Sequence, residues 1–284
     1  MTLPLTSILT PVFNNLRCVE LLHRTLTEQT RDAPWELLLI DNGSTEPGFE
    51  AFYTRLEREP NVRVIRNGRN LGFGKANNIG LSHAAGEILA LLNSDMFTLR
   101  PWLAPALARF AAEPRCGAVQ GGILLPEENA PPAAWRTQTI GARFDDQGLP
   151  QYFLDGLLPD DPRLAAPLTL EAFMGTGVLL RRAAVEAVGF FDEAFDLVFL
   201  EDTDLSLRLS EAGWTIRYEP ETLFHHFHAS SMPYLSQEEY DRSRRANLAR
   251  FRALWPWERL RRVVAPHQPI LGSDHSVRDE SYWK

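Results

Sequence analysis

Three polar residues that could bind a metal ion and a phosphate follow a short apolar run. The run Ile88–Leu92 leads directly into Asn93, Ser94 and Asp95, so the side-chain oxygens of Asn93 and Asp95 stand two residues apart. In an extended chain, residues two apart lie on the same face. Such oxygens suit Mg²⁺ and Mn²⁺, which share their remaining positions with water and substrate phosphates. This segment is therefore a candidate site for a divalent cation and a phosphorylated ligand.

A second acidic group lies at Glu201, Asp202 and Asp204, in the first turn of a helix predicted over Leu200–Ala212. Carboxylates in the first turn of a helix complement its macrodipole, which is a purely structural role. The same position keeps a carboxylate ionised, as a general base needs when it takes a proton from a hydroxyl. The residues by themselves leave both interpretations open.

Three histidines cluster in the segment His225–His228. A histidine is more often a packed or surface residue than a ligand. With Asn93 and Asp95 as oxygen ligands, however, one of these imidazoles could complete a coordination sphere of the Mn²⁺ type.

The glycine-rich segment Gly68–Gly80 fits neither common nucleotide-binding loop. Five residues separate Gly68 from the Gly-Lys pair, whereas a P-loop has four, and the glycine spacing of a dinucleotide fingerprint is also absent. The segment instead predicts a loop that enters a helix near Phe73. Arg69, Asn70 and the first N–H groups of that helix could face a phosphate or a base.

Short apolar runs alternate with amphipathic stretches over the first 125 residues, which predicts an α/β fold with parallel strands joined by crossover helices. The candidate strands are Thr6–Val12, Trp35–Ile40, Val62–Ile65, Glu87–Leu92 and Ala118–Leu124. In such a sheet, ligands bind beyond the carboxyl ends of the strands. Between the first two strands, Asn14 and Asn15 are expected to cap a helix that begins at Leu16.

The second half of the chain is expected to cover this sheet. Residues 126–170 hold seven prolines and no sustained periodicity, so they predict a long excursion over the sheet. Further strands are predicted at Gly175–Leu180, Trp214–Tyr218 and Thr222–Phe227, and a helical tail with many arginines at Gln237–Val264. The resulting domain prediction is 1–235, with halves 1–125 and 126–235, followed by a helical tail at 236–284.

Composition limits the classes of partner. The net charge of -8 argues against nucleic acid, whose phosphates favour basic surfaces. Cys18 and Cys116 have no metal-ligand spacing and are too few for a disulfide framework, so a reducing compartment is expected. With no signal-like N-terminus and no long apolar run, a cytoplasmic or surface-attached protein is expected.

The charge is unevenly distributed. Residues 126–161 carry seven acidic residues against two arginines, and residues 241–262 carry eight arginines against two acidic residues. The basic tail could lie on an anionic membrane surface. Alternatively, it could be an ordinary helix that packs on the domain, with its arginines solvated or paired with acids. Both interpretations stay open.

Taken in chain order, the motifs resemble the GT-A glycosyltransferases of family 2, particularly the bacterial rhamnosyltransferase-like branch. The resemblance runs from about Leu5 to Ser231, and eight motifs in one order make it specific. It rests on segments 8–14, 39–44, 70–78, 92–95, 175–177, 189–193, 201–205 and 225–226. Asn93 stands where the family more often has the first aspartate of an Asp-x-Asp motif.

The resemblance implies a Rossmann-like, mostly parallel sheet flanked by helices, and a role for each matching residue. Asp202 would be the catalytic base, supported by Glu201. Asp95 and His225 would bind a divalent cation, Mg²⁺ or Mn²⁺. The nucleotide sugar would contact Pro11, Phe13, Asp41, Asn42, Asn70, Lys75, Asn93 and Ser94.

The implied reaction is an inverting transfer from a UDP- or dTDP-linked sugar, rhamnose among the candidates, to a hydroxyl of a glycan or glycolipid acceptor in surface polysaccharide synthesis. The alternatives are a non-catalytic nucleotide- or carbohydrate-binding module of the same fold, and a sugar-phosphate nucleotidyltransferase. The expected location is the cytoplasm, with peripheral contact to the inner face of the membrane through the tail.

Overall fold

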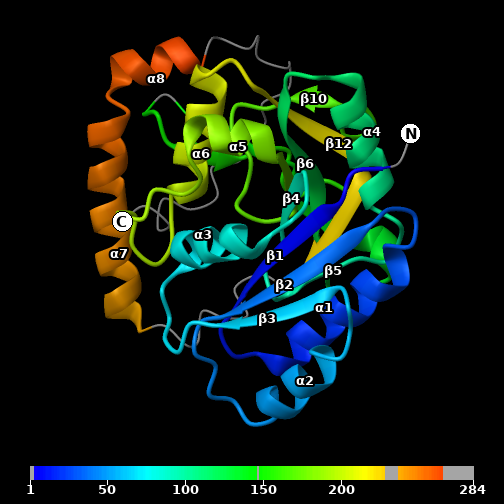
Figure 1. The fold of residues 1–284 in the computed structure, drawn as a ribbon. Helices are drawn as coiled ribbons and strands as arrows, with labels where there is room; N and C mark the ends of the chain where they lie inside the picture. The colour runs from blue at the N-terminus through cyan, green and yellow to red at the C-terminus, as the bar shows by residue number, and fades with distance from the viewer. Residues whose placement is uncertain (1–2, 146, 228–235, 265–284) are drawn as a thin grey trace.

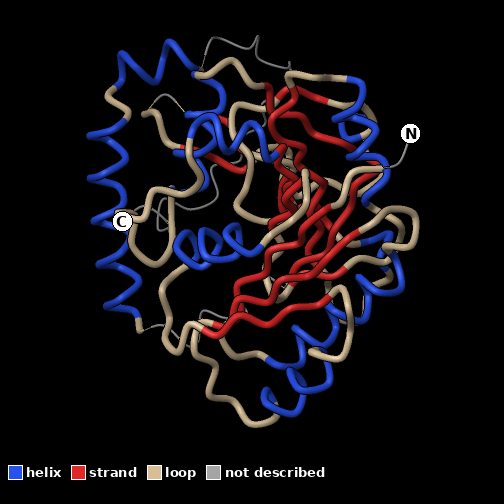
Figure 2. The backbone as a smooth tube through the Cα atoms, in the orientation of Figure 1, coloured by secondary structure: helices blue, strands red, loops and turns tan. Residues whose placement is uncertain are grey.

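A central twisted sheet with helices on both faces forms the body of the protein (Figures 1 and 2). The computed structural model describes residues 3–145, 147–227 and 236–264. Over these residues the main sheet runs in the order β10-β12-β6-β11-β4-β1-β2-β3, and β5 and β7 pair with β12 and β6. A separate hairpin joins β8 to β9. The predicted α/β architecture is confirmed.

The N-terminal strands agree with the sequence prediction. Strands β1 (Thr6–Val12), β2 (Trp35–Asp41), β3 (Val62–Arg66) and β4 (Ile88–Leu91) pair in parallel, so their carboxyl ends share one edge of the sheet. Next to β4, the strand β11 (Val178–Arg181) is antiparallel to both of its neighbours. Strand β6 (Cys116–Leu125) extends beyond the predicted run at both ends.

The two short strands predicted at the C-terminal side form one long strand, β12 (Thr215–His226). It runs parallel to β6, and the pairing shifts register between Glu219 and Leu223. A local irregularity of this kind bends a strand without ending it. The turn-like residues between the two predicted strands therefore lie inside β12.

The apolar side chains form two layers, one on each face of the sheet, which explains why apolar runs alternate with amphipathic stretches in the sequence. One layer packs α1 (Leu16–Gln29), α2 (Phe49–Leu56) and α4 (Leu103–Ala112) against one face of the sheet. The other packs α3 (Phe73–His83), α5 (Arg182–Val188) and α6 (Glu201–Glu211) against the opposite face. Ile8 belongs to the first layer and Leu9 to the second, as period-two alternation along a strand requires.

The predicted asparagine cap of α1 is wrong in its mechanism. Asn15 occupies the cap position in a left-handed conformation, and its side chain makes no capping hydrogen bond. The N–H of Leu16 donates instead to the Glu46 carboxylate at 3.1 Å. The Asn14 amide oxygen accepts from the N–H groups of Thr45 and Glu46 at 2.8 and 3.1 Å. Asn14 thus ties the loop after β1 to the loop after β2, at the carboxyl edge of the sheet.

The predicted excursion over residues 126–170 contains short elements. They are the strands β7 (Arg136–Thr139), β8 (Ala142–Phe144), β9 (Pro150–Tyr152) and β10 (Leu168–Thr169), with short helices at Pro132–Ala134 and Pro162–Leu164. The two-residue strand β5 (Met96–Phe97) lies directly after Asp95. Because β5 pairs with β12, the end of β12 lies beside the Asn93–Asp95 segment.

The predicted tail forms two helices, α7 (Gln237–Leu254) and α8 (Trp257–Val263), along one side of the molecule (Figure 1). A capping box between Ser236 and Glu239 starts α7. Phe251, Trp255 and Leu260 form a third apolar cluster with residues of α6 and of the loop before it. In the part of the chain that the structure describes, no helix is long and apolar enough to cross a membrane.

Candidate active site

The carboxyl ends of β1, β2 and β4 present the predicted nucleotide-binding residues along one edge. Asp41, Asn42 and Ser94 are buried there, and Pro11 and Phe13 are half-buried at the end of β1. The Asp41 carboxylate accepts from the N–H of Ser44 at 3.0 Å, a contact that shapes the turn after β2.

Two of the predicted binding residues also shape the loop that enters α3. The Asn70 amide oxygen accepts from the N–H of Gly72 at 2.9 Å. Asn42 donates to the Gly72 carbonyl at 3.4 Å and accepts from Asn67 at 2.8 Å. Lys75 follows in the first turn of α3 and is half-buried. The loop is thus held by amide side chains at the carboxyl edge of the sheet.

Asp95 meets a histidine from β12. Its Oδ1 lies 3.0 Å from Nε2 of His226, and the other ring nitrogen of His226 lies 2.8 Å from Oε1 of Gln138 in β7. A carboxylate oxygen accepts hydrogen bonds, so the contact with Asp95 uses a hydrogen on Nε2, and a cation bound between the two groups would replace that hydrogen. Metal-binding histidines commonly show this arrangement, in which the second ring nitrogen donates to a fixed oxygen.

The structure pairs Asp95 with His226 and not with the predicted His225. The His225 ring stacks on Phe97 with centroids 4.9 Å apart and meets the Trp135 ring edge-on at 5.2 Å. Burial lowers the pKa of His225 to about 4, so its ring is neutral at pH 7. Its buried Nδ1 has no hydrogen-bond partner among the described residues. Adjacent residues of a strand point to opposite faces, which explains why only one of the pair reaches Asp95.

The donor set of this edge fits a hard divalent cation. A carboxylate oxygen and an imidazole nitrogen 3.0 Å apart could bind one ion together. Over the described residues, no cluster of three or more His, Cys, Asp or Glu side chains forms a complete site. Mg²⁺ and Mn²⁺ tolerate this because waters and substrate phosphates supply their other ligands. The third histidine, His228, lies outside the described residues.

Asp202 lies at the start of α6 and is tied to the loop before β11. Its Oδ2 accepts from the N–H of Gly175 at 2.7 Å, and its Oδ1 accepts from the N–H of Thr203 at 2.7 Å. Burial raises the pKa of Asp202, and these two backbone donors oppose that rise. Asp202 is half-buried.

Glu201 has a different environment although it is adjacent in sequence. It is only 7% exposed, and its Oε2 has no hydrogen-bond partner among the described residues. Burial, followed by the charge of Asp202, raises the pKa of Glu201 well above its ordinary value. A charge on one carboxyl group disfavours ionisation of the other, and the proton is held more readily by Glu201, whose pKa is raised well above its ordinary value.

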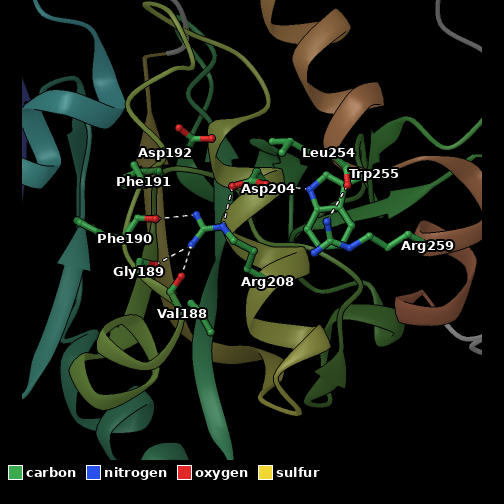
Figure 3. Close-up of a pocket in the computed structure, with 10 residues that line it drawn as sticks. All are labelled: Val188, Gly189, Phe190, Phe191, Asp192, Asp204, Arg208, Leu254, Trp255 and Arg259. Atoms are coloured by element: carbon green, nitrogen blue, oxygen red, sulfur yellow. Dashed lines mark hydrogen bonds and ion pairs between the residues drawn. The ribbon is translucent and has the colours of Figure 1, made fainter.

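The side chain of Asp204, the third acidic residue, points into the interface with the helical tail, beside Trp255 (Figure 3). It accepts from Arg208 at 2.8 Å and from the indole N–H of Trp255 at 2.8 Å. A cavity of about 360 Å³ lies beside these residues. Its Arg208 guanidinium also donates to the carbonyls of Val188, Gly189 and Phe190. With its donors engaged in this way, Arg208 has a structural role.

Sequence reasoning missed the residues that connect the two halves of the site. The Thr176 hydroxyl accepts from the N–H of Asn93 at 2.9 Å. Buried Gln120 accepts from the N–H of Met174 and donates to the carbonyls of Thr176 and Gly177. The Gly-Thr-Gly motif at 175–177 could identify this loop from the sequence. A single polar residue in an apolar strand, Gln120, gives no such signal.

The fold of this chain is similar to that of solved glycosyltransferases. The crystal structure of GalNAc-T7 with UDP, GalNAc and Mn²⁺ has a TM-score of 0.65 to this chain at 19% identity, covering 79% of this chain and 44% of that one. The mannosyltransferase PcManGT from Pyrobaculum calidifontis, solved with GDP-Man and Mn²⁺, has a TM-score of 0.57 at 18% identity, covering 88% and 64%. At these identities the likeness concerns the fold.

The model of glycosyl transferase family 2 matches residues 7–189, more than half of the chain. The chain therefore belongs to this family and is a glycosyltransferase, as the motifs predict. The match ends before Glu201 and before the tail.

Two relatives support the rhamnosyltransferase-like branch. The N-acetylglucosaminyl-diphospho-decaprenol L-rhamnosyltransferase of Mycobacterium tuberculosis is 32% identical over 222 residues, 70% of this chain and 69% of that protein. The O-antigen biosynthesis protein RfbC of Myxococcus xanthus is 30% identical over 237 residues, 80% of this chain. The protein y4gI of Sinorhizobium fredii is 28% identical to this chain over 235 residues. This chain spans only 18% of the length of RfbC and 25% of the length of y4gI.

The raised pKa of Glu201 predicts a pH-dependent effect of Glu201→Gln. Since folding raises this pKa above its ordinary value near 4.5, the folded protein holds a proton that the unfolded chain releases, and stability falls as pH rises from that value toward the folded pKa. Because glutamine does not titrate, the variant does not lose stability in this way as pH rises. Urea unfolding should show that the variant gains stability over wild type between pH 5 and pH 8.

The control is Glu186→Gln, whose parent side chain is 62% exposed. It should show no such trend. A Glu201→Gln variant whose stability relative to wild type is the same at both pH values would contradict a protonated Glu201.

Proposed function

We propose that this chain is an inverting glycosyltransferase that moves a sugar from a nucleoside diphosphate sugar to a hydroxyl of a glycan or lipid-linked glycan. One observation carries the proposal. The N–H of Gly175 donates to the Asp202 carboxylate, and the hydroxyl of the next residue, Thr176, accepts from the N–H of Asn93. A base for the acceptor and the segment for the donor diphosphate are thereby joined through a single loop.

Asp202 is the proposed base. Its carboxylate takes the proton of the acceptor hydroxyl, and the oxygen forms a bond to the anomeric carbon of the donor sugar. The bond from that carbon to the diphosphate oxygen breaks on the opposite face, so the configuration inverts and the nucleoside diphosphate leaves. The N–H groups of Gly175 and Thr203 favour the ionised form of Asp202, and a neutral Glu201 avoids a second charge beside it.

The donor would lie along the carboxyl edge of β1, β2 and β4. Pro11, Phe13 and Asp41 are the proposed contacts of the base and ribose, and Asn42 and Asn70 hold the adjoining loop. Lys75, in the first turn of α3, would face the diphosphate, as would Asn93 and Ser94. Parallel sheets bind ligands at this edge.

Asp95 and His226 are the residues proposed to hold Mg²⁺ or Mn²⁺, with His226 taking the role first assigned to His225. A bound cation would neutralise the negative charge that develops on the leaving diphosphate. Gln138 keeps the His226 ring oriented for this role.

Asp202→Asn tests the proposed base. The amide cannot accept the proton, so turnover should fall by about 10²–10⁴-fold, while UDP or dTDP affinity stays close to that of wild type. Steady-state kinetics with a panel of UDP- and dTDP-hexoses and calorimetric titration of the nucleotides measure the two effects. Exposed Asp160 offers the matched control Asp160→Asn, which should leave both unchanged. Near-normal turnover of Asp202→Asn would remove Asp202 from the mechanism.

His226→Ala and His225→Ala separate the two histidines. Removing a ligand should weaken Mn²⁺ binding in the presence of UDP by at least about tenfold in His226→Ala. His225→Ala should leave Mn²⁺ affinity nearly unchanged and lower the melting temperature, because this ring packs against Phe97 and Trp135. Calorimetry and the electron paramagnetic resonance signal of free Mn²⁺ report binding directly. Weaker Mn²⁺ binding in His225→Ala alone would reverse the assignment.

The acceptor is proposed to be lipid-linked. The Mycobacterium tuberculosis relative is by name a rhamnosyltransferase of a glycosylated diphospho-decaprenol. A deoxyhexose donor and an acceptor on a membrane lipid are the corresponding proposals for this chain. The outward face of α7 and α8 supports membrane contact, because it exposes a set of arginines that anionic headgroups attract: Arg242, Arg245, Arg252, Arg261 and Arg262. We place the protein at the cytoplasmic face of a membrane.

Vesicle flotation tests the basic face. Changing Arg242, Arg245 and Arg252 together to Gln should reduce partition onto phosphatidylserine vesicles by about a hundredfold, from about 1 kcal/mol for each basic residue near the surface. The same charge change at the exposed residues Arg17, Arg31 and Arg58 is the control and should have a smaller effect. Equal flotation of the two triple variants would defeat the membrane contact.

A further inference from the structure

We propose that Asn247, in the middle of α7, is a positioning residue for the Glu201–Asp202 pair. The inference rests on the proposed function of Asp202. It concerns the segment Asp196–Leu200, which leads directly into α6. Asn247 lies outside the residues that the family model matches.

The Asn247 side chain is 1% exposed and directs its whole amide at this segment. Its oxygen accepts from the N–H of Asp196 at 2.8 Å. Its nitrogen donates to the carbonyls of Val198 at 2.8 Å, and of Asp196 and Phe199 at 3.1 Å. One side chain thus provides partners for four backbone groups of a loop that has no regular structure of its own.

The same segment ends in an unfavourable backbone conformation. Phe199 and Leu200 have φ values of 92° and 73°, in the left-handed region that residues with a Cβ rarely adopt. Such residues persist only where the surroundings hold them. Leu200 is the residue before Glu201, and its carbonyl accepts from the N–H of Asp204 to open α6. The direction of the first turn of α6 therefore depends on this pair.

The opposite side of the segment contacts the nucleotide half. The Leu197 carbonyl accepts from the N–H of Phe73 at 3.0 Å. Gly72 approaches so closely that a Cβ there would lie 2.7 Å from Cα of Leu197. The segment is held between the start of α3 and the inner face of α7.

Other contacts of α7 flank Asn247 on the same face of the helix. One turn before it, Ser243 exchanges longer hydrogen bonds of 3.3 and 3.4 Å with Val198. One turn after it, Phe251 lies in the apolar cluster with Leu200. These residues hold α7 against the domain, whereas Asn247 contacts the backbone from Asp196 to Phe199, directly before Leu200. Removing its amide leaves buried carbonyls without partners, which lets the turn relax.

Displacement of this turn would move Asp202 relative to Gly175 but leave the nucleotide edge in place. Asn247→Ala should therefore lower turnover by about 10–100-fold, since small misplacements of reacting groups have effects of this size. Affinity for UDP and dTDP should stay close to that of wild type. Backbone amides of residues 196–200 should exchange hydrogen faster, because their local opening requires less energy.

The test uses the full chain with four variants. Asn247→Asp keeps the shape and the acceptor oxygen but not the donor, so it tests the proposal even where Asn247→Ala fails to fold. Ala249→Ser, on the exposed face of α7, is the matched control. Phe251→Leu weakens the same interface without touching the amide contacts. Hydrogen exchange by mass spectrometry, nucleotide titration and turnover of the best donor in the hexose panel are measured for each.

Three results in the Asn247 variants together support the proposal: faster exchange at residues 196–200, lower turnover, and unchanged affinity for UDP or dTDP. The Phe251→Leu variant must keep its turnover at an equal loss of melting temperature. Unchanged exchange overturns it, as does faster exchange with wild-type turnover. A wild-type chain that turns over no donor contradicts the proposed function itself. The exchange result still decides whether Asn247 holds the turn, so the two failures are distinguishable.

Discussion

The hydrogen bond from the Gly175 N–H to the Asp202 carboxylate joins the two halves of the proposed catalytic site, because the residue after Gly175 bonds to the segment after β4. Asp202 comes from a helix on one face of the sheet, whereas Asn93 follows a central strand. Their relative position is set by one short loop, and that loop is in turn held by Gln120 from inside β6. Chemistry at this edge depends on the rigidity of those backbone contacts.

The electrostatics of the adjacent carboxyl groups follow from the same packing. Asp202 has two backbone donors and partial exposure, so it can carry a charge near neutral pH. Glu201 is buried with an unpartnered oxygen, and its pKa rises accordingly. The two neighbouring carboxyl groups thus differ in environment, because backbone N–H groups contact Asp202 whereas Oε2 of Glu201 has no hydrogen-bond partner among the described residues.

Much of the fold was predictable because apolar runs in parallel strands are long and nearly continuous. The bounds of β1 were predicted to the residue, and those of β2 and β3 to within one. Elements shaped by long-range contacts were not. Asn15 has the composition of a helix cap, yet the N–H of Leu16 finds Glu46, thirty residues away. The turn-like residues inside β12 are tolerated because pairing with β6 resumes after the shift in register.

By itself, the sequence determined the α/β class, the family and the motifs that bring Asp41, Asp95 and Asp202 to the carboxyl edge, since these depend on local patterns and strand order. Only the tertiary structure decided that His226 reaches Asp95 while His225 packs on Phe97, because the pairing of β12 with β5 determines which face each ring occupies. It also placed Asn247 beside the turn before Glu201. A lone asparagine in a basic helix carries no local signal, and its role depends on a backbone fifty residues away.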